Sequence, residues 1–451
     1  MAGQFPNIPG TGDNVPVSSY TVGITEAYPN VNRQRIVESS INSKEKVDVL
    51  PVNMGVNYRL SDKYLEFRIP GTIGSFIDLA SLVIEMKLQI KKNNGEDIPD
   101  DLNIGVVNGI SNSLFKSISI FINDKMIESN PLFNYTSYLK MLMSINSDNI
   151  NSFGKCGFFH DDANNGEVTK SYTNAIFTTA GNLENKLLQT LKGEGVDVCF
   201  PLLFDISTLD MYLLDGVDLR IRLEIASNSW IFNSNNANPQ LSLNIGKVKL
   251  WMDRVIPHYN AMTALNQALS VKPIEYVFQK TLHKTYIVGA NENSIMIDRP
   301  FGMVIPEKMH MLIINMNAFS GRSTLNGLYF EHANLENYHV TVNGNTFYNV
   351  NTDFSNSFYS QSYYETLKTI GINNNHMIDY NTFKAGRSVF SFNFVHETVE
   401  ETLPVESSAN LRLTLKFSAN LTSPHTIILL AETTGLISID ANRMVTCDVR
   451  G

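Results

Sequence analysis

"SISIFINDKMIE", residues 117–128, and "YHVTVNGNTFYN", residues 338–349, carry the same pattern about 220 residues apart. In both stretches apolar side chains occupy alternate positions, and an asparagine follows directly. The aligned pairs are Ile118 with Tyr338, Ile120 with Val340, Ile122 with Val342, and Asn123 with Asn343. Alternation with a period of two predicts a half-buried β-strand, and the asparagine predicts a tight turn after it. The chain therefore contains one strand-and-turn signal twice.

Four further segments repeat in the same order around these two stretches. Segment 81–90 matches 308–319, 134–145 matches 362–370, 198–206 matches 389–397, and 218–227 matches 410–419. The pair 134–145 and 362–370 is predicted to be helical, because its apolar residues recur at spacings of three and four. Its aligned residues are Ser137 with Ser362, Tyr138 with Tyr363, Leu142 with Leu367, and Ile145 with Ile370. After the helix the first copy carries roughly 33 extra residues, which predicts an insertion within 146–195.

Two copies of one all-β unit account for this repeat, each close to 200 residues long with one short helix. Antiparallel strands with one polar face pack as two sheets, so we predict two tandem jelly-roll (β-sandwich) domains with about eight strands each. The composition agrees, because 451 residues with 43% hydrophobic and 18% charged side chains supply ample core.

Residues 1–60 differ from the rest of the chain. Five of the 16 prolines lie there, among Gly, Asn and Ser, and the apolar residues follow no period. We therefore predict an extended N-terminal arm over 1–60, because such a segment has no core of its own. The remaining divisions are a first jelly roll over 61–257, a connector with helical character over 258–271, and a second jelly roll over 272–451.

Charge and cysteine usage argue against several functional classes. A net charge of −9 is opposite to what a protein that wraps DNA requires. Cys156, Cys199 and Cys447 form no CxxC pair, which predicts free thiols in a reducing compartment and no zinc ribbon or redox motif. We also expect neither a secretory signal nor a membrane-spanning helix, because no suitable apolar run occurs.

Clusters of His, Asp and Glu lack the spacing that metal or catalytic sites need. "HETVEE" (396–401) continues a strand and has no second His one helical turn later. Glu96, Asp97, Asp100 and Asp101 are spaced too irregularly for a calcium loop. Neither a phosphate-binding G-x-x-x-x-G-K-[ST] loop nor a G-x-S-x-G turn occurs. We therefore predict that the protein is not an enzyme, has no catalytic, cofactor-binding or metal-binding residues, and needs no cofactor.

A tandem repeat without catalytic residues suggests a building block. Three chains would supply six similar barrels around a threefold axis, and such a pseudo-hexagon can tile a surface. The N-terminal arm is not needed to close that ring. It can instead contact neighbouring tiles, becoming ordered only on assembly.

Residues 78–144 resemble the double jelly-roll major capsid proteins of Polinton/Maverick-type elements and adintoviruses. The resemblance is carried by Asn112-Ser113-Leu114-Phe115 before an alternating strand, Asn123 at its turn, and the Tyr135-x-x-Tyr138-Leu139 helix. Beyond these residues the similarity is architectural. It implies a major capsid protein whose homotrimers form pseudo-hexagonal capsomers of an icosahedral shell around a double-stranded DNA genome.

The resemblance also implies a location and partners. The protein would be made in the host cytoplasm or nucleus and reside in the virion capsid. It would contact further copies of itself and a penton or minor capsid protein, without specific nucleic-acid binding; contact with an internal membrane stays open. Two alternatives remain, a non-capsid scaffold or domesticated double jelly-roll protein, and a glycan-cleaving amidase of the same architecture.

Overall fold

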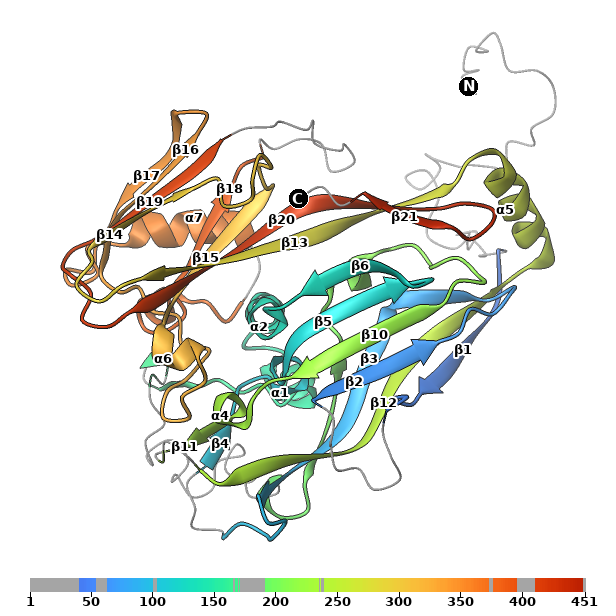
Figure 1. The fold of residues 1–451 in the computed structure, drawn as a ribbon, viewed down its shortest axis with the longest axis horizontal. Coiled ribbons are helices and arrows are strands. Elements are labelled where there is room, and N and C mark those ends of the chain that lie inside the picture. Colours follow the sequence, from blue (N-terminus) through green and yellow to red (C-terminus); the bar gives the residue numbers. More distant parts are fainter. Residues whose placement is uncertain are drawn as a thin grey trace, which may run out of the picture. The chain divides into compact units, whose positions relative to one another are not determined.

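The computed structural model shows two domains built on one strand plan (Figure 1). It describes residues 40–53, 63–99, 104–164, 167, 168, 170, 191–234, 236, 239–372, 376–395 and 410–448. In the part of the chain that the structure describes, no helix combines the length and apolarity needed to cross a bilayer.

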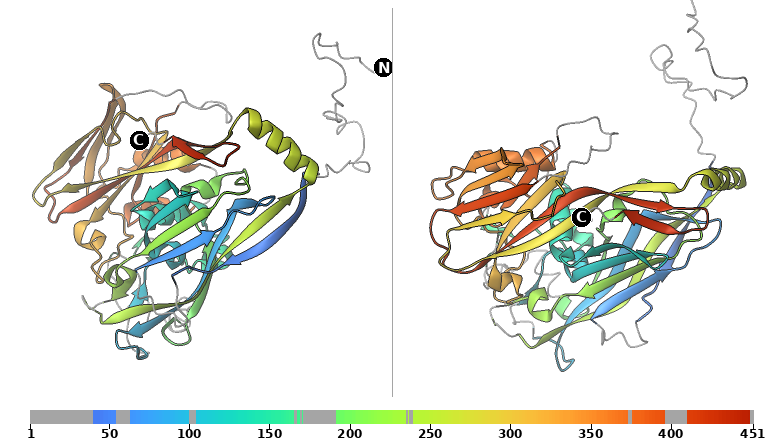
Figure 2. Two further views of the ribbon diagram at one scale, coloured as in Figure 1. Left: turned by 45° about the vertical axis from the view of Figure 1, so that its right-hand side comes forward. Right: turned by 45° about the horizontal axis from the view of Figure 1, so that its top comes forward.

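The first domain consists of two four-stranded antiparallel sheets (Figures 1 and 2). One sheet has the order β1-β12-β3-β9, and the other has the order β2-β10-β5-β6. The strands are β1 (Ile41–Val49), β2 (Tyr64–Ile69), β3 (Phe76–Lys92), β5 (Phe115–Ile122), β6 (Lys125–Asn130), β9 (Val196–Pro201), β10 (Leu219–Ile225) and β12 (Leu241–Pro257).

The second domain repeats this arrangement. Its sheets have the orders β13-β20-β15-β18 and β14-β19-β16-β17, and a further strand, β21 (Val445–Asp448), pairs with β20. The strands are β13 (Ile274–Val288), β14 (Ser294–Asp298), β15 (Lys308–Asn315), β16 (Leu335–Val342), β17 (Asn345–Asn351), β18 (Val389–Asn393), β19 (Leu411–Phe417) and β20 (His425–Ile439).

Each strand of the second domain holds the place of its counterpart in the first. β15 lies between β20 and β18 as β3 lies between β12 and β9, and the hairpin β16–β17 corresponds to β5–β6. The segments matched in the sequence thus occupy equivalent positions. The predicted fold class, all-β with two tandem jelly rolls, is confirmed.

Strand alternation builds the core of each jelly roll. Leu82, Ile84, Met86, Leu88 and Ile90 on one face of β3 are at most 1% exposed, as their period of two predicts. Burying such side chains stabilises the fold by roughly 1.5–3 kcal/mol each. A slip of one residue in register would expose them all, so the pattern also fixes the register.

The repeated asparagine has the same structural role in both domains. Asn123 and Asn343 adopt positive φ, 45° and 51°, in the two-residue turns of the β5–β6 and β16–β17 hairpins. Asn123 Oδ1 accepts a hydrogen bond from Asp218 N at 2.7 Å, and Asn343 Oδ1 accepts one from Asn410 N at 2.8 Å. Each asparagine thereby makes the turn and ties it to the next strand of the sheet.

Two longer helices follow equivalent hairpins, and a third joins the domains. α2 (Phe133–Ser144) follows β6, α7 (Ser360–Ile370) follows β17, and α5 (Tyr259–Val271) connects β12 to β13 as predicted for that segment. The short elements are β4 (Ile104–Val106), α1 (Ile110–Ser113), η2 (Ile150–Gly154), β7 (Ala163–Asn164), β8 (Glu167–Val168), η3 (Asp205–Thr208), α4 (Asn228–Ile231), β11 (Phe232–Ser234), α6 (Met316–Phe319) and α8 (Tyr380–Lys384).

The predicted arm over 1–60 differs from the structure at its C-terminal part. Residues 41–49 form β1, which pairs along its length with β12 at the edge of the first sheet. The sequence does not reveal this strand because β1 is half exposed and only a few of its residues are apolar. The parts of the arm over 1–39 and 54–60 lie outside the described residues.

Candidate functional site

The most elaborate polar structure in the described chain lies where the two jelly rolls meet. On the first domain this joint is formed by α2, β6 and η3, together with residues of the predicted insertion. On the second domain it is formed by β13, α6, the β20–β21 turn and residues before β18. Three charged groups and one aromatic group hold the two surfaces together.

The first charged group centres on Arg387, which is 1% exposed. Its Nη2 donates to Asp161 Oδ1 and Asp162 Oδ1, both at 2.9 Å, and its Nη1 donates to the carbonyl of Met377 at 2.6 Å. Burial alone lowers the pKa of the guanidinium, but Asp162, Tyr138 and Asp161 outweigh it, so the net shift is upward. The charge is therefore retained inside the joint.

The aspartates that bind Arg387 belong to the predicted insertion within 146–195. In its described part, this segment contributes buried residues to the interior of the protein. Phe159 is fully buried and packs against Tyr138 of α2, and Ile150 is 8% exposed. The length of segment 146–195 shows that the first copy carries extra residues. It does not show that these residues pack into the joint.

The second charged group centres on Asp205, which is 2% exposed. Its carboxylate accepts hydrogen bonds from Lys140 Nζ at 3.1 Å and from the backbone N–H and hydroxyl of Thr281 at 2.7 and 2.8 Å. Its own N–H donates to Glu128 Oε2 at 3.0 Å. Because Thr281 lies on β13, this group ties the second domain to η3 of the first.

The third charged group holds the β20–β21 turn. Arg443 Nη2 donates to Asp215 Oδ1 at 2.6 Å, and Arg443 Nε donates to the Asp215 carbonyl at 2.8 Å. The other carboxylate oxygen accepts from Gly74 N at 2.8 Å. The carbonyl of Arg443 accepts from Asn123 Nδ2 at 2.8 Å, so the repeated asparagine also reaches the second domain.

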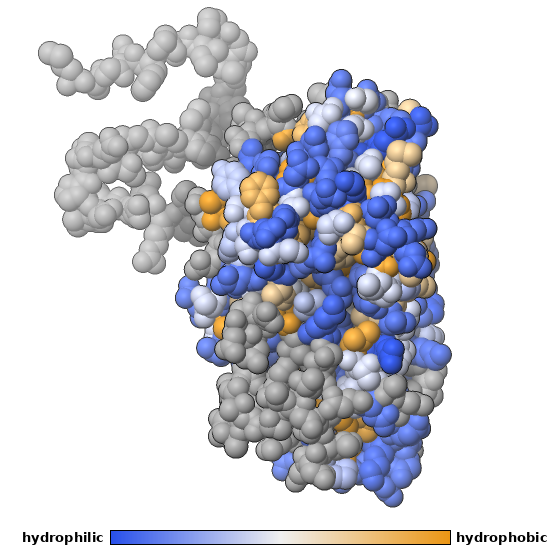
Figure 3. All heavy atoms as spheres, turned by 90° about the vertical axis from the view of Figure 1, so that its left-hand side faces the viewer, coloured by the Kyte–Doolittle hydropathy of each residue, from blue (hydrophilic) through white to orange (hydrophobic). Residues whose placement is uncertain are grey.

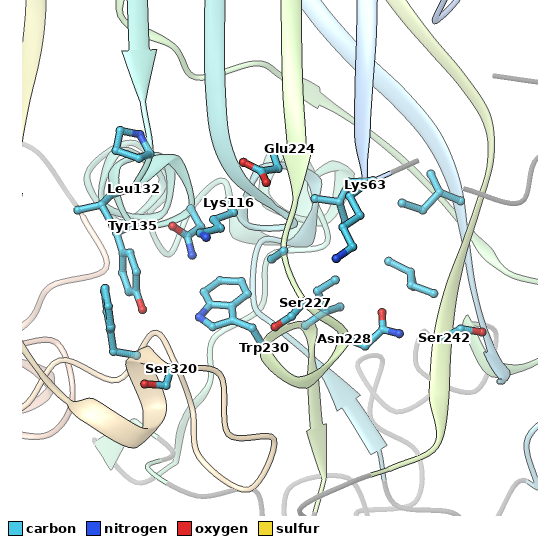
Figure 4. Close-up of a pocket in the computed structure, with 18 residues that line it drawn as sticks. Lys63, Lys116, Leu132, Tyr135, Glu224, Ser227, Asn228, Trp230, Ser242 and Ser320 are labelled. Carbon is cyan, nitrogen blue, oxygen red and sulfur yellow. The ribbon is translucent and has the colours of Figure 1, made fainter. Parts of the chain in front are cut away.

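An aromatic cluster seals the joint near α4 and α6. The rings of Tyr135 and Phe319 are stacked with centroids 5.7 Å apart, and Trp230 meets Tyr135 edge-on at 6.2 Å. A Cβ on Gly327 would lie 2.8 Å from Trp230 Nε1, so the indole fits only against a glycine there. Beside this cluster opens a pocket of about 740 Å³ (Figure 4).

These groups couple two domains mechanically, and they are not arranged as a nucleophile, base and orienter. Among the described residues, no group of three or more His, Cys, Asp or Glu side chains is placed to hold a metal ion. Glu96 and Asp97 form exposed ion pairs with Lys92 and Lys91 in a turn. The "HETVEE" segment (396–401) lies outside the described residues. Cys156 and Cys199 are exposed free thiols, and Cys447 is half-buried.

Sequence reasoning missed the joint residues for a physical reason. Arg387 and Asp161 are 226 residues apart, and Asp215 and Arg443 are 228 apart. No local period marks them. The available signals were Asn123, which the repeat had singled out for its turn, and Tyr135 and Tyr138 of the predicted helix.

Comparison with known proteins shows the fold. No family model matches the chain, and no curated protein matches it in sequence. Among solved structures, a chain of the Sputnik virophage has a TM-score of 0.58 and 11% identity, with 97% of this chain and 94% of that chain covered. The mavirus major capsid protein has a TM-score of 0.52 and 12% identity, with 98% and 97% covered.

A chain of the PBCV-1 virus capsid has a TM-score of 0.58 and 12% identity, with 93% of this chain and 99% of that chain covered. In all three comparisons, the similarity extends over nearly the full length of both chains. The chain therefore shares with these viral proteins a fold of two tandem jelly rolls joined in one polypeptide.

Proposed function

We propose that the protein is the major capsid protein of a virus or virus-like element, with a structural rather than a catalytic role. Its homotrimer would form a pseudo-hexagonal capsomer that tiles an icosahedral shell around a double-stranded DNA genome. Two observations support this proposal: the joint already holds two jelly rolls as neighbours, and the whole chain shares its fold with proteins of three viral shells. Fold similarity alone does not establish function, so one further observation carries the argument.

That observation is the unequal burial of two equivalent helices. In α2 the buried residues are nine of twelve, from Phe133 to Leu142, whereas in α7 they are Ser362, Thr366 and Thr369 alone. α2 is covered partly by its own domain, where Phe159 packs on Tyr138, and partly by the second domain, with Phe330 edge-on to Tyr138 at 6.0 Å. The part of the chain that the structure describes holds no third jelly roll to cover α7 in the same way.

The surface around α7 carries the side chains that an interface needs. Phe358, Tyr364 and Ile372 are 64%, 55% and 54% exposed. By contrast, the face formed by β14, β16 and β17 shows mostly hydrophilic residues with apolar ones in small separate groups (Figure 3). Exposed apolar residues on α7 and just beyond its two ends support a contact with another chain.

Repeating the joint between chains closes a ring. If the first domain of a second copy covers α7 as the second domain covers α2, each domain has two similar neighbours. Six domains from three copies then complete the ring with closed symmetry. The same reasoning supports further copies as the main partner and the virion capsid as the location. A penton or minor capsid protein and the Polinton or adintovirus relationship belong to this proposal as well.

The test is the mass of the assembled protein. Light scattering during size exclusion should give about three times the 50.5 kDa of the chain, and micrographs of the overexpressed protein should show closed particles. The double variant Tyr364→Lys/Ile372→Lys should give folded monomers. Met296→Lys is the control, because Met296 is 63% exposed on β14 away from α7. A wild-type monomer at high concentration, or a trimeric α7 variant, would contradict the proposal.

A further inference from the structure

The pocket beside the joint lies at one end of the first jelly roll. Lys63 precedes β2, Lys116 lies at the start of β5, and Leu243 comes from the opposite sheet, so the pocket opens between the two sheets. Phe319 and Ser320 of the second domain close one side of it (Figure 4). Its volume of about 740 Å³ is that of a site for a small molecule.

Two adjacent polar groups in the pocket wall, the Trp230 N–H and the Tyr135 hydroxyl, have no hydrogen-bond partner beyond each other. Trp230 Nε1 and the Tyr135 hydroxyl are buried, their side chains belong to residues 7% and 2% exposed, and neither forms a hydrogen bond of good geometry with any other protein group. Figure 4 shows the two side chains next to each other at the pocket, with their rings edge-on. The other indole of the chain is paired, since Trp251 Nε1 donates to Glu85 Oε2 at 2.5 Å.

Both groups are donors in this environment, and the phenol proton is the one that no protein group accepts. An indole N–H can only donate. Burial raises the pKa of the Tyr135 hydroxyl, and a hydrogen bond from the Trp230 N–H to the phenol oxygen offsets only part of that rise, so the phenol stays protonated. Asn134 Oδ1 is a buried acceptor without a partner, which a bridging water can serve. The wall thus calls for a ligand with acceptor oxygens.

The charged residues of the pocket indicate the sign of the ligand's charge. Lys63 and Lys116 both reach into it, and neither forms an ion pair with a described residue. The one acidic residue of the lining, Glu224, already accepts a hydrogen bond from Ser117 at 2.9 Å. The pocket therefore carries an excess of positive charge and of donors, which suits an anion.

The rest of the lining is apolar. Leu132, Ile225, Ile231, Leu243 and Phe319 supply walls on which an anion alone would make few contacts. We propose that the pocket binds a small amphipathic anion: an apolar chain or ring that carries a carboxylate or a phosphate. The carboxylate or phosphate would bind the two lysines and the buried donors, and the apolar chain or ring would lie along these walls.

The ligand would also act on the joint. Its binding groups come from the first domain, but Phe319 belongs to the second, so an occupied pocket is held from both sides. A ligand that binds only the folded, joined state raises the midpoint of thermal unfolding. This inference does not depend on shell assembly and can be tested on soluble protein of any oligomeric state.

The experiment uses Trp230 as its own reporter. In a Trp251→Phe variant Trp230 is the only tryptophan, so its fluorescence reports on the pocket. Decanoate and decyl phosphate, kept below their micelle concentrations, are the probes for the two heads. Acetate supplies a head without a body, and decyltrimethylammonium supplies the body with the opposite charge. We expect saturable changes and a raised thermal midpoint with at least one decyl anion, and neither with acetate or the cation.

Substitutions locate the binding in the pocket. Lys63→Met and Lys116→Met should each weaken binding about fivefold to tenfold, the loss typical of a charge-assisted hydrogen bond. Tyr135→Phe should weaken it about threefold. Lys125→Met, at an exposed turn outside the pocket, is the matched control and should leave binding unchanged. The proposal is overturned if neither decyl anion binds saturably, if the cation binds equally well, or if Lys125→Met weakens binding as much as the pocket variants.

Discussion

α2 and α7 occupy equivalent positions in the two jelly rolls, yet their surroundings differ. Leu142 of α2 is fully buried, and its counterpart Leu367 of α7 is half-buried. Tyr138 packs against Phe330 of the other domain, whereas Tyr363 packs against Tyr380 and Phe383 of its own. The two helices arise from one local pattern, and the presence or absence of a neighbouring domain makes them different.

This difference separates two functions that one fold can serve. The charged groups around α2 fix the two domains of a chain to each other. The exposed apolar residues around α7 leave a surface for another copy in the proposed capsomer. Four experiments test whether burial, and not helix sequence, distinguishes the two sites.

Arg387→Met should have the largest effect, because it breaks the joint at its most buried ion pair. Removing one partner of a buried pair deprives the Asp162 carboxylate of the Arg387 charge and costs about 3–5 kcal/mol. The shift of the midpoint of guanidinium unfolding measures it.

Arg412→Met is the matched control for this prediction. Arg412 pairs with Asp298 in the second domain, and both side chains are nearly half exposed at 46% and 48%. Such a surface pair is worth about 1 kcal/mol or less. Equal losses for the two arginines would show that the joint does not depend on the buried charge.

Leu142→Ala and Leu367→Ala compare the helices directly at aligned positions. The first should cost about 2–5 kcal/mol, because the methyl groups leave a cavity in a packed core. The second should cost about 1 kcal/mol in the isolated chain, since Leu367 is already partly in contact with water. Both substitutions are made in the Tyr364→Lys/Ile372→Lys variant, which is expected to be monomeric, and chemical denaturation then measures each loss of stability. A larger loss for Leu367→Ala than for Leu142→Ala would contradict the comparison.

Asn123→Gly and Asn343→Gly test the repeated turn. Glycine accepts the positive φ of both sites, so only the side-chain hydrogen bonds are lost. Asn123 loses the bonds to Asp218 and Arg443, while Asn343 loses the bond to Asn410. At about 0.5–1.5 kcal/mol per bond, Asn123→Gly should be the more destabilising by about 1 kcal/mol. Equal thermal midpoints would mean that the bond across the joint contributes nothing.

Glu128→Gln should have the smallest effect, visible as a change with pH. Burial, followed by the charge of Asp205, raises the pKa of Glu128 well above its ordinary value of 4.5. The folded state then binds this proton more tightly than the unfolded state. The stabilisation from this proton is complete at a pH below the pKa of Glu128 in the unfolded state. It is lost as pH rises through the pKa of Glu128 in the folded state.

The glutamine variant carries no such proton, so its stability relative to wild type should increase as pH rises from 4.5 through the higher folded pKa of Glu128. The equivalent position in the second domain is Tyr348, whose hydroxyl bonds the backbone of Asn393. Tyr348→Phe is therefore a control whose effect should not vary over this pH range. A constant difference between Glu128→Gln and wild type would refute the prediction.

Features with a local period were predictable from the sequence. The strand at 81–90, the hairpins with Asn123 and Asn343, and the connecting helix all appear where their patterns predicted them. The order of the repeated segments was sufficient for the fold class. The sequence did not predict β1, because an edge strand needs few apolar residues. It did not predict the burial of Phe159 either, because an insertion carries no period of its own.

By itself, the sequence determined the strands, their turns and the duplication of the unit, because the pleat of a strand repeats every two residues and leaves that repeat in the chain. Only the tertiary structure decided which copy of the helix is covered, and it alone brought Arg387 to Asp161 and Asp162, Thr281 to Asp205, and the buried donors of Trp230 and Tyr135 into one pocket. The physical reason is distance along the chain. A contact between single residues far apart depends on how whole domains pack, and no short stretch of sequence records it.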